Sequence, residues 1–282
     1  MELTPQLSQA AAPLTHAVAA LNQHGDTVQL HIPAERALTV YVDKRELVTL
    51  MTLGAHPEWL VLGYLRNQRL VDSVAEIASI QVDWEVGAAA VTTRHGIAHI
   101  EERTTSKVVT TGCGQGSMFG NLMDEVDGIR LGPARVSQAQ LYGVVNAIRL
   151  KESTYKSAGS VHACALFSGQ ELLLFVEDVG RHNAIDTIAG WMWLQGAATA
   201  QGQDKLFYTT GRLTSEMVIK SAQMGVPIVV SRSGMTQMGH ALATQLGLCA
   251  IGRATNKNFV CYSAPERLQM QVELAGPRTL RD

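Results

Sequence analysis

The sequence predicts an α/β protein, with a larger C-terminal domain built on a mixed, mostly parallel sheet and a smaller N-terminal α+β domain. From residue 161 to residue 262, short apolar runs alternate with stretches of helical periodicity. Such alternation is typical of a mostly parallel sheet that helices cover on both faces. Ahead of residue 133, strand-like runs dominate. We therefore predict a flexible tail over residues 1–25, an N-terminal domain over 26–133 and a C-terminal domain over 134–282.

The N-terminal half contains the strand-like runs and one clear helix. Apolar and polar residues alternate over 27–32 and 37–43, which predicts that these two segments pair as a hairpin. Pro57 in a first turn predicts a helix over Glu58–Arg66. The remaining expected elements are a strand over Glu46–Leu53, two or three short strands between Ile77 and Ile100, a Gly/Ser-rich loop over Thr110–Gly120 and a connector over Asp124–Pro133.

The C-terminal half begins with a helix whose start is marked by a capping box, Ser137 with Gln140 three residues later. Gly225 and Gly247 follow two of the later helical stretches, at the position where glycine commonly ends a helix. The expected strands are Val161–Phe167, Glu171–Val176, Lys205–Thr209, Pro227–Ser231, Cys249–Ile251 and Phe259–Tyr262, and the expected helices between them are Ala184–Leu194, Ser215–Met224 and Thr236–Leu246.

The composition excludes several classes of protein. Of the 282 residues, 46% are hydrophobic and 17% are charged, which suffices for a packed core. A net charge of -2 creates no basic field that would attract nucleic acid or a membrane surface. The longest apolar runs, such as Val226–Val230, are too short to span a bilayer. Because no basic segment followed by an apolar one begins the chain, we expect a cytoplasmic protein.

The four cysteines are of two kinds. Cys164, Cys249 and Cys261 lie in apolar strand-like runs, and we expect them to be inert core residues. Cys113 lies among glycines in the loop Thr110–Ser117, where we expect an exposed thiol. Nearby backbone N–H groups can lower the pKa of such a thiol, so Cys113 is a candidate nucleophile. The alternative is an ordinary loop with an incidental cysteine.

The most informative segment is Glu177–Asp186, which holds three carboxylates, an arginine, a histidine and an asparagine. It separates a predicted strand from a predicted helix, which is where α/β proteins bind ligands. Asp178 could cap the helix, while Arg181, His182 and Asn183 could bind an anion. The alternative is a capped helix start with a solvated charge cluster. Since a cap needs only one such residue, we interpret the segment as a binding site.

Two further loops follow predicted strands and precede predicted helices. In the loop over residues 210–216, Gly211 lets the backbone turn, Arg212 offers a fork of donors, and Thr214 or Ser215 caps the helix. The loop over residues 231–236 places Arg232 one βα unit later. Strand ends of a parallel sheet meet at one edge, so these loops and the segment at 177–186 could share one pocket. The alternative is a pair of plain connecting loops.

A possible metal pair, His162 and Cys164, is the weakest candidate. The chain contains no Cys-x-x-Cys spacing, so neither a structural zinc site nor a deaminase-type zinc site is expected. We expect His162 to form hydrogen bonds within or beside the predicted pocket.

Several segments, in this order, resemble the formate dehydrogenase accessory sulfurtransferase family, FdhD. The resemblance extends over roughly residues 27 to 265 and is most specific in the string Glu177–Asp186. The matching strings are Cys113-Gly114, Gly159–Leu166, Glu177–Asp186, Gly211–Lys220 and Gly225–Pro227.

The resemblance implies a cytoplasmic homodimer that accepts sulfur from a cysteine desulfurase. It implies delivery of that sulfur to the bis-guanine-dinucleotide molybdenum or tungsten cofactor, as cargo destined for formate dehydrogenase, through a persulfide on a Cys-x-x-Cys loop. It also implies a larger domain that resembles cytidine deaminases but lacks their zinc. In that setting Cys113 would carry the sulfur, and Arg181, His182, Arg212 and Arg232 would hold the cofactor phosphates.

The chain departs from the family pattern at positions near the expected site. Gly116 replaces the second cysteine of the loop, Thr187 replaces a lysine, and Ser233–Thr236 differs from the usual Ser-Ala-Pro-Thr. One thiol suffices to hold a persulfide, but a relay thiol is lost. Two hypotheses follow: a sulfur carrier that uses Cys113, or a chaperone that only binds the cofactor. A third, a deaminase-like hydrolase, is disfavoured by the missing metal ligands.

Overall fold

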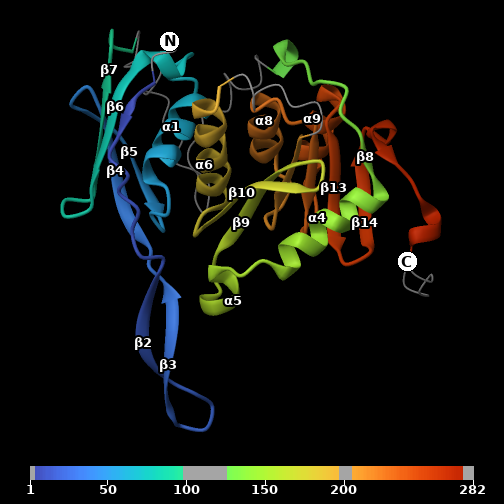
Figure 1. Cartoon of the computed structure of the whole chain (residues 1–282), viewed down its shortest axis with the longest axis horizontal. Helices are drawn as coiled ribbons and strands as arrows, with labels where there is room; N and C mark the ends of the chain where they lie inside the picture. The colour runs from blue at the N-terminus through green and yellow to red at the C-terminus, as the bar shows by residue number, and fades with distance from the viewer. Residues whose placement is uncertain (1–3, 98–125, 197–204, 276–282) are drawn as a thin grey trace. The chain divides into compact units, whose positions relative to one another are not determined.

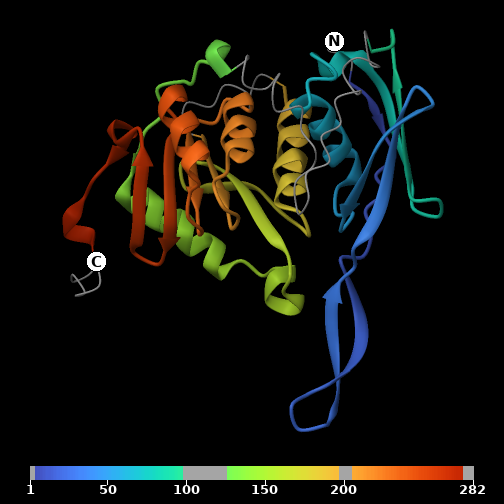
Figure 2. The same ribbon diagram turned by 180° about the vertical axis from the view of Figure 1, so that it is seen from behind.

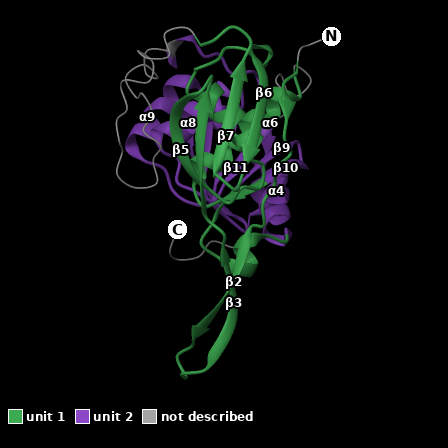
Figure 3. Cartoon of the chain, turned by 90° about the vertical axis from the view of Figure 1, so that its left-hand side faces the viewer, with its two compact units in different colours: residues 1–120, 152–163, 176–196 green, residues 121–151, 164–175, 197–282 purple. Residues whose placement is uncertain are grey.

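The computed structural model describes residues 4–97, 126–196 and 205–275 (Figure 1). These residues form two compact units (Figure 3). Unit 1 comprises residues 1–120, 152–163 and 176–196, and unit 2 comprises residues 121–151, 164–175 and 197–282. The chain therefore crosses between the units several times, which differs from the single boundary predicted near residue 133. Within the described ranges, no helix is both long and apolar enough to cross a membrane.

Unit 1 is built on a mixed five-stranded sheet and a pair of packed helices. Its strands are β1 (Gln6–Leu7), β4 (Arg36–Val42), β5 (Arg45–Thr52), β6 (Ile77–Asp83) and β7 (Ala88–Thr93), and its helical segments are α1 (Pro57–Asn67), η1 (Val74–Glu76), α5 (Thr154–Ala158) and α6 (Arg181–Leu194). The strand order is β1-β6-β7-β4-β5. Alternate residues of β4, including Leu38 and Val40, join Leu62 and Leu65 of α1 in one hydrophobic core.

The remaining strands of unit 1 form a separate ribbon. β2 (Thr15–Leu21) and β3 (Thr27–Pro33) pair only with each other, in an antiparallel two-stranded sheet. The prediction of a flexible tail over residues 1–25 is therefore wrong, because β1 and β2 both lie there.

The predicted hairpin between residues 27–32 and 37–43 is also wrong, although both segments are strands. β3 pairs with β2, and β4 pairs antiparallel with β5. The tight turn between β4 and β5 is Asp43-Lys44, and both residues have positive φ, at 47° and 72°. Two-residue hairpin turns of this kind usually contain Asn-Gly or Asp-Gly, so the sequence Asp-Lys does not predict the turn.

The described residues of unit 2 form a six-stranded sheet and three α-helices. The strands are β9 (His162–Ser168), β10 (Glu171–Asp178), β11 (Lys205–Thr209), β12 (Ile228–Ser231), β13 (Cys249–Thr255) and β14 (Asn258–Ser263), and the helices are α4 (Gln138–Leu150), α8 (Ser215–Gln223) and α9 (Gln237–Leu246). β8 (Val136–Ser137) and β15 (Leu268–Gln269) form a small parallel pair, and the short helical turns are η2 (Val126–Gly128), η3 (Pro265–Arg267) and η4 (Val272–Leu274). The first residues of β9 and the last of β10 are grouped with unit 1.

The main sheet is mixed, as the sequence predicts. Its order is β10-β9-β11-β12-β13-β14. β12 pairs parallel with both β11 and β13, whereas β9 and β14 pair antiparallel with their neighbours β11 and β13. The parallel pairing is thus confined to the centre of the sheet, so the prediction that the sheet is mostly parallel is wrong.

Both faces of this sheet are buried, as expected. Alternate strand residues, such as Phe167 and Tyr208, share a core with Leu141 and Val144 of α4. Figure 2 shows the ribbon of this sheet and its helices from behind. The intervening residues, such as Phe207, are fully buried as well, so the opposite face is also covered. The predicted start of α4 is confirmed, because Ser137 and Gln140 form a complete capping box.

Candidate functional site

The polar segment Glu177–Asp186 joins the end of β10 to the start of α6. β10 ends at Asp178, and α6 begins at Arg181, earlier than the predicted Ala184. Gly180 precedes the helix, and no side chain caps it. The predicted cap by Asp178 is therefore wrong. An uncapped helix start presents backbone N–H groups and a partial positive charge, which favour an anion.

Asp178 uses both carboxylate oxygens to hold this turn against the end of β5. Oδ2 accepts hydrogen bonds from Thr52 Oγ1 at 2.5 Å and from Leu53 N at 3.3 Å. Oδ1 accepts from Gly180 N at 3.2 Å and from Asn183 Nδ2 at 2.9 Å. Burial raises the pKa of the Asp178 carboxyl, although the hydrogen bonds from Thr52 and Asn183 oppose that rise.

Asn183 and Asp178 are joined by a hydrogen bond and hold the same turn. Its Nδ2 also donates to the carbonyl oxygen of Met51 at 2.6 Å, and the side chain is buried. Asp178 and Asn183 thus join the start of α6 to β5. Their contacts give both residues a positioning role, and the direct cofactor binding that the sequence suggested for them stays a prediction.

The other two carboxylates of the segment are likewise engaged within unit 1. Glu177, which is 7% exposed, accepts hydrogen bonds from Thr154 N at 2.5 Å and Tyr155 N at 3.0 Å, at the start of α5. Asp186 is fully buried in α6 and accepts from Asn67 Nδ2 at 2.6 Å, at the end of α1. The three carboxylates of this segment therefore connect separate elements of the fold.

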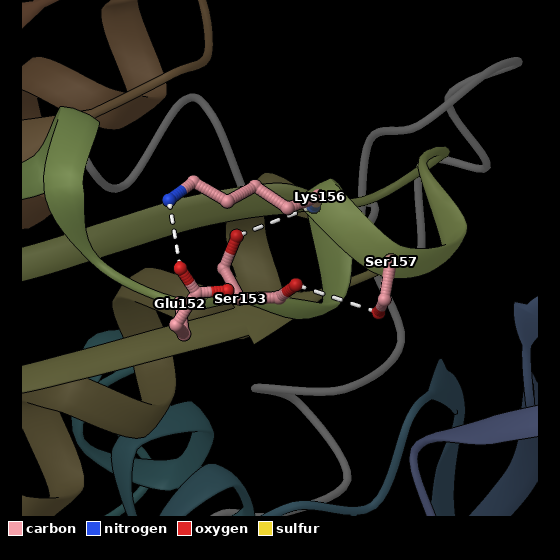
Figure 4. A network of polar contacts seen from close by, with 4 residues as sticks. All are labelled: Glu152, Ser153, Lys156 and Ser157. Atoms are coloured by element: carbon pink, nitrogen blue, oxygen red, sulfur yellow. Dashed lines mark hydrogen bonds and ion pairs between the residues drawn. The ribbon is translucent and has the colours of Figure 1, made fainter.

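The start of α5 also has local contacts that Figure 4 displays. Ser153 Oγ accepts from Lys156 N at 3.3 Å, and Ser157 Oγ donates to the Ser153 carbonyl oxygen at 3.4 Å. Lys156 Nζ lies 3.4 Å from Glu152 Oε1, in an exposed pair that contributes little to stability. The buried bonds from Glu177 are the ones that join this short helix to β10.

α6 is fixed in place by an unusually close crossing with α1. A Cβ atom built on Gly63 of α1 would lie 1.7 Å from the carbonyl oxygen of Asp186. One built on Gly190 of α6 would lie 2.0 Å from the carbonyl oxygen of Trp59. Backbone meets backbone at this crossing, so only glycine fits at either position.

Two nitrogen-bearing side chains of the segment, those of Arg181 and His182, remain as candidates for ligand binding. Arg181 is the first residue of α6 and is 9% exposed, and its Nε has no hydrogen-bond partner among the described residues. A buried N–H without an acceptor is unfavourable, so a bound anion would stabilise it. His182 is 1% exposed and follows in the same turn.

In unit 2, the loops after β11 and β12 support each other. Leu213 N donates to the Gly234 carbonyl oxygen at 3.0 Å, and Ser231 Oγ donates to the Gly211 carbonyl oxygen at 2.6 Å. Leu213 and Met235 also form a parallel bridge. The two loops are thus a single platform at the carboxyl ends of parallel strands, as the sequence predicts.

This platform presents its cations to solvent. Arg212 and Arg232 are both exposed, and Ser215 is the half-buried first residue of α8. Thr214 precedes α8 but its side chain does not cap the helix, whereas Thr236 caps α9. Thr214 Oγ1 is buried and has no hydrogen-bond partner in the described part of the chain. Hydroxyl and guanidinium groups are both suited to phosphate, and these loops contain one such hydroxyl and two such guanidinium groups.

The shared pocket of three loops stays a prediction. The structure brings the Arg212 and Arg232 loops together in unit 2, and the Arg181 segment belongs to unit 1.

The His162 and Cys164 pair lies at the start of β9. Cys164 is fully buried, and its Sγ donates to Thr209 Oγ1 at 3.4 Å. His162 is half-buried. Across the described ranges, no three His, Cys, Asp or Glu side chains gather closely enough to hold a metal ion.

The candidate nucleophile Cys113 lies outside the described residues. Of the other cysteines, Cys164 and Cys249 are buried as expected, but Cys261 is only half-buried. Cys261 lies on β14, the edge strand of the sheet, with its Sγ 4.0 Å from that of Cys249. The expectation of three equally inert thiols is therefore wrong for Cys261.

We predict that these thiols will be alkylated at different rates. The hydrogen bond between the pair lowers the pKa of Cys261 and raises that of Cys249. Because the thiolate is the reactive form, Cys261 should react well before Cys249 and Cys164, and Cys113 should react first if its loop is exposed. Peptide mapping after timed exposure to iodoacetamide measures the order. Equal rates at Cys261 and Cys164 would contradict it.

Sequence reasoning missed the residues that position α6, namely Thr52, Asn67, Gly63 and Gly190. The glycines left one signal, because a glycine inside a helix costs about 1 kcal/mol relative to alanine and so suggests a packing constraint. Thr52 and Asn67 left none.

The fold is that of an α/β protein, and arginines lie at or just before the starts of α6, α8 and α9. Residues 33–269 match the model of the FdhD/NarQ family. The chain therefore belongs to the FdhD/NarQ family, as its resemblance to FdhD predicts.

Named relatives and a solved structure agree with this assignment. A protein of Bacillus subtilis named sulfur carrier protein FdhD is 31% identical over 247 residues, which cover 86% of this chain and 92% of the relative. One of the same name from Staphylococcus haemolyticus is 28% identical over 236 residues, covering 83% and 88%. The crystal structure of a candidate formate dehydrogenase accessory protein from Desulfotalea psychrophila aligns with a TM-score of 0.71 at 25% identity, over 91% of this chain and 100% of that one.

Proposed function

We propose that this protein is a sulfur carrier for the maturation of formate dehydrogenase. Cys113 accepts sulfur from a cysteine desulfurase and delivers it to the bis-guanine-dinucleotide molybdenum or tungsten cofactor. The observation that carries the proposal is the match to a relative named as a sulfur carrier over 86% of the chain. We place this chemistry in the cytoplasm, and we expect a homodimer with no nucleic-acid or membrane partner.

The transfer needs one nucleophilic thiol and no added oxidant. The Cys113 thiolate attacks the terminal sulfur of the desulfurase persulfide, a new S–S bond forms, and the old one breaks. The donor thiolate leaves with the electron pair and takes up a proton. Cys113 then holds the sulfur as a persulfide, ready for the cofactor.

The cofactor arrives as cargo, and its two diphosphate groups are anions. In unit 2, Arg212, Arg232 and the Thr214 hydroxyl form a donor set that fits phosphate oxygens. In unit 1, the buried Nε–H of Arg181 has no acceptor within the part of the chain that the structure describes. Together with His182, Gly211 and Ser215, these residues are the proposed binding groups.

Intact-protein mass spectrometry tests the sulfur carrier. After incubation with desulfurase and cysteine, the protein should gain the mass of one sulfur atom, and a reductant should remove it. The Cys113→Ala variant should gain nothing, and the matched control Cys261→Ala should behave as the unchanged protein. Labelling that persists in Cys113→Ala would contradict the assigned carrier residue.

A cofactor-binding chaperone without sulfur transfer is the second candidate, and one observation favours it. Gly116 stands where the resemblance leads us to expect a second loop thiol. If the lost thiol limits transfer, Gly116→Cys should raise the activity of formate dehydrogenase matured with this protein. If Cys113→Ala supports maturation as well as the unchanged protein does, the chaperone function is the correct one.

We predict that Arg212→Ala weakens the binding of guanosine diphosphate by about 1.5–3 kcal/mol, the contribution of a charge-assisted hydrogen bond. Titration calorimetry measures the change. Arg149→Ala removes another exposed arginine of unit 2, from α4, and should leave the affinity unaltered. Equal affinities for both variants would remove Arg212 from the proposed site.

A further inference from the structure

Two thiols lie in contact at the edge of the unit 2 sheet, and sulfur transfer through Cys113 uses neither of them. Cys249 is the first residue of β13, and Cys261 lies on β14, the edge strand that pairs antiparallel with it (Figure 1). The two Sγ atoms are 4.0 Å apart, within hydrogen-bonding contact for sulfur. Both side chains pack in the hydrophobic core that also includes Leu141 of α4. The pair is therefore a candidate for chemistry between two sulfur atoms.

The backbone around the pair is held in place by Ser263 of β14. Its Oγ accepts a hydrogen bond from Ala250 N at 3.3 Å and donates to the Leu248 carbonyl oxygen at 2.7 Å, so it binds both chain neighbours of Cys249. The sulfur atoms of a disulfide are about 2.05 Å apart, so the two Sγ atoms must approach by about 2 Å to form one. Rotation about the Cα–Cβ bonds moves an Sγ atom by that distance. A disulfide can therefore form while the two strands keep their register.

The two thiols differ in exposure and in acidity. Cys249 is fully buried, whereas Cys261 is half-buried. The hydrogen bond with Cys249 lowers the pKa of Cys261, while the hydrogen bond with Cys261, together with burial, raises the pKa of Cys249. Because the thiolate is the form that reacts, a small oxidant from solvent should react at Cys261 first. The oxidised sulfur would then be in contact with the Cys249 thiol.

The surroundings of Cys249 favour its ionisation once Cys261 has reacted. Oxidation of Cys261 removes the thiolate whose hydrogen bond raises the pKa of Cys249, and the positive charge of Arg267 opposes the part of the rise that burial causes. Arg267 Nε donates to the Gly247 carbonyl oxygen at 2.8 Å, which fixes the guanidinium near the start of β13. Cys261 is thus suited to attack an oxidant, and Cys249 is suited to resolve the product.

We propose that Cys261 and Cys249 are a modification site for hydrogen peroxide, at which Cys261 is oxidised and Cys249 then forms a disulfide with it. The Cys261 thiolate attacks a peroxide oxygen, the O–O bond breaks, and hydroxide leaves and takes up a proton. Cys261 is then a sulfenic acid. The Cys249 thiolate attacks its sulfur, an S–S bond forms, the S–O bond breaks, and a second hydroxide takes up the proton that Cys249 lost. Two thiols lose two electrons and the peroxide becomes two waters, and thiol reductants reverse the modification.

Peptide mapping without reductant tests the disulfide. Trypsin cleaves after Arg253 and Lys257, so the two thiols fall in separate peptides, residues 233–253 and 258–267. After peroxide treatment and alkylation in denaturant, these peptides should appear joined, with the mass of two hydrogen atoms lost, and dithiothreitol should separate them. The Cys113→Ala variant should give the same joined peptides, because sulfur transfer is not involved. Failure of the two peptides to join, or their joining to a Cys164 peptide instead, would overturn the proposal.

Capture of the sulfenic acid by dimedone tests the order of the two steps. Cys249→Ser keeps a hydrogen-bond donor beside Cys261 but cannot form the disulfide, so dimedone should label Cys261 in this variant. If Cys249→Ser does not fold, as judged by circular dichroism, Cys249→Ala takes its place. Cys261→Ala is the matched variant, and dimedone should leave its buried Cys249 unlabelled. Labelling of Cys249 in Cys261→Ala as strong as that of Cys261 in Cys249→Ser would contradict the assigned roles.

Discussion

Gly63→Ala should be the most destabilising single substitution in unit 1. The added Cβ would lie 1.7 Å from the Asp186 carbonyl oxygen and 2.7 Å from the Gly190 backbone nitrogen. Neither atom can rotate away, because both belong to the backbone of α6. Overpacking of a core costs about 1–3 kcal/mol where side chains can adjust, so we expect a loss above about 3 kcal/mol. Denaturant unfolding followed by circular dichroism measures it.

A second helical glycine provides the control. A Cβ on Gly143 of α4 would approach Gln170 Oε1 at 2.7 Å, which is the end of a flexible side chain that can move. Alanine also favours a helix over glycine by about 1 kcal/mol, so Gly143→Ala should be neutral or stabilising. If both variants unfolded at the same denaturant concentration, the close crossing of α1 and α6 would be ruled out.

Asp178→Ala should be the next most damaging change, and it should act on stability before it acts on ligand binding. The carboxylate accepts four hydrogen bonds, from Thr52, Leu53, Gly180 and Asn183. Each buried donor left without an acceptor costs about 1–3 kcal/mol, and partial rearrangement would limit the total to about 3–5 kcal/mol. Thermal melting and nucleotide titration of the same variant separate the two effects. A normal melting temperature with lost binding would restore Asp178 as a ligand-binding residue.

The same carboxyl makes stability depend on pH. Burial raises the folded-state pKa of Asp178 above its ordinary value of 3.8, so the folded protein holds this proton to higher pH than the unfolded chain does. The stabilisation is present in full below 3.8 and is lost as the pH rises through the folded-state pKa. Asp178→Asn cannot titrate and should lack this fall. Asp72→Asn, which removes an exposed carboxyl of unit 1, serves as the control, and a wild-type slope in Asp178→Asn would contradict the assignment.

The fold was predictable wherever the signal was local. The capping box at Ser137 and the glycines after α8 and α9 mark helix ends through adjacent residues alone, and Gly225 and Gly247 both have positive φ. Pairing between distant strands was not predictable in the same way. β4 lies between β5 and β7, and nothing in its alternating pattern distinguishes those neighbours from β3.

The candidate site shows the same difference between features with a local sequence signal and features without one. The loops bearing Arg212 and Arg232 were located correctly, because parallel neighbouring strands end at one edge. The carboxylates of Glu177–Asp186 were interpreted as binding groups from their density. Their partners, such as Thr52 and Asn67, lie more than a hundred residues away in the chain. Periodicity and spacing report on neighbours, so a structural use of these carboxylates could not be recognised from the sequence.

The hydrogen bonds that Glu177, Asp178 and Asp186 accept within the chain also affect how active sulfur carriers can be recognised among related sequences. A relative that had lost sulfur transfer would still use these carboxylates to join the segment to α5, β5 and α1, so we expect it to keep them. A search for genes that encode this string therefore finds proteins that share the fold, whether or not they transfer sulfur. We expect sulfur carriers and relatives without sulfur transfer to differ instead at positions 113 and 116.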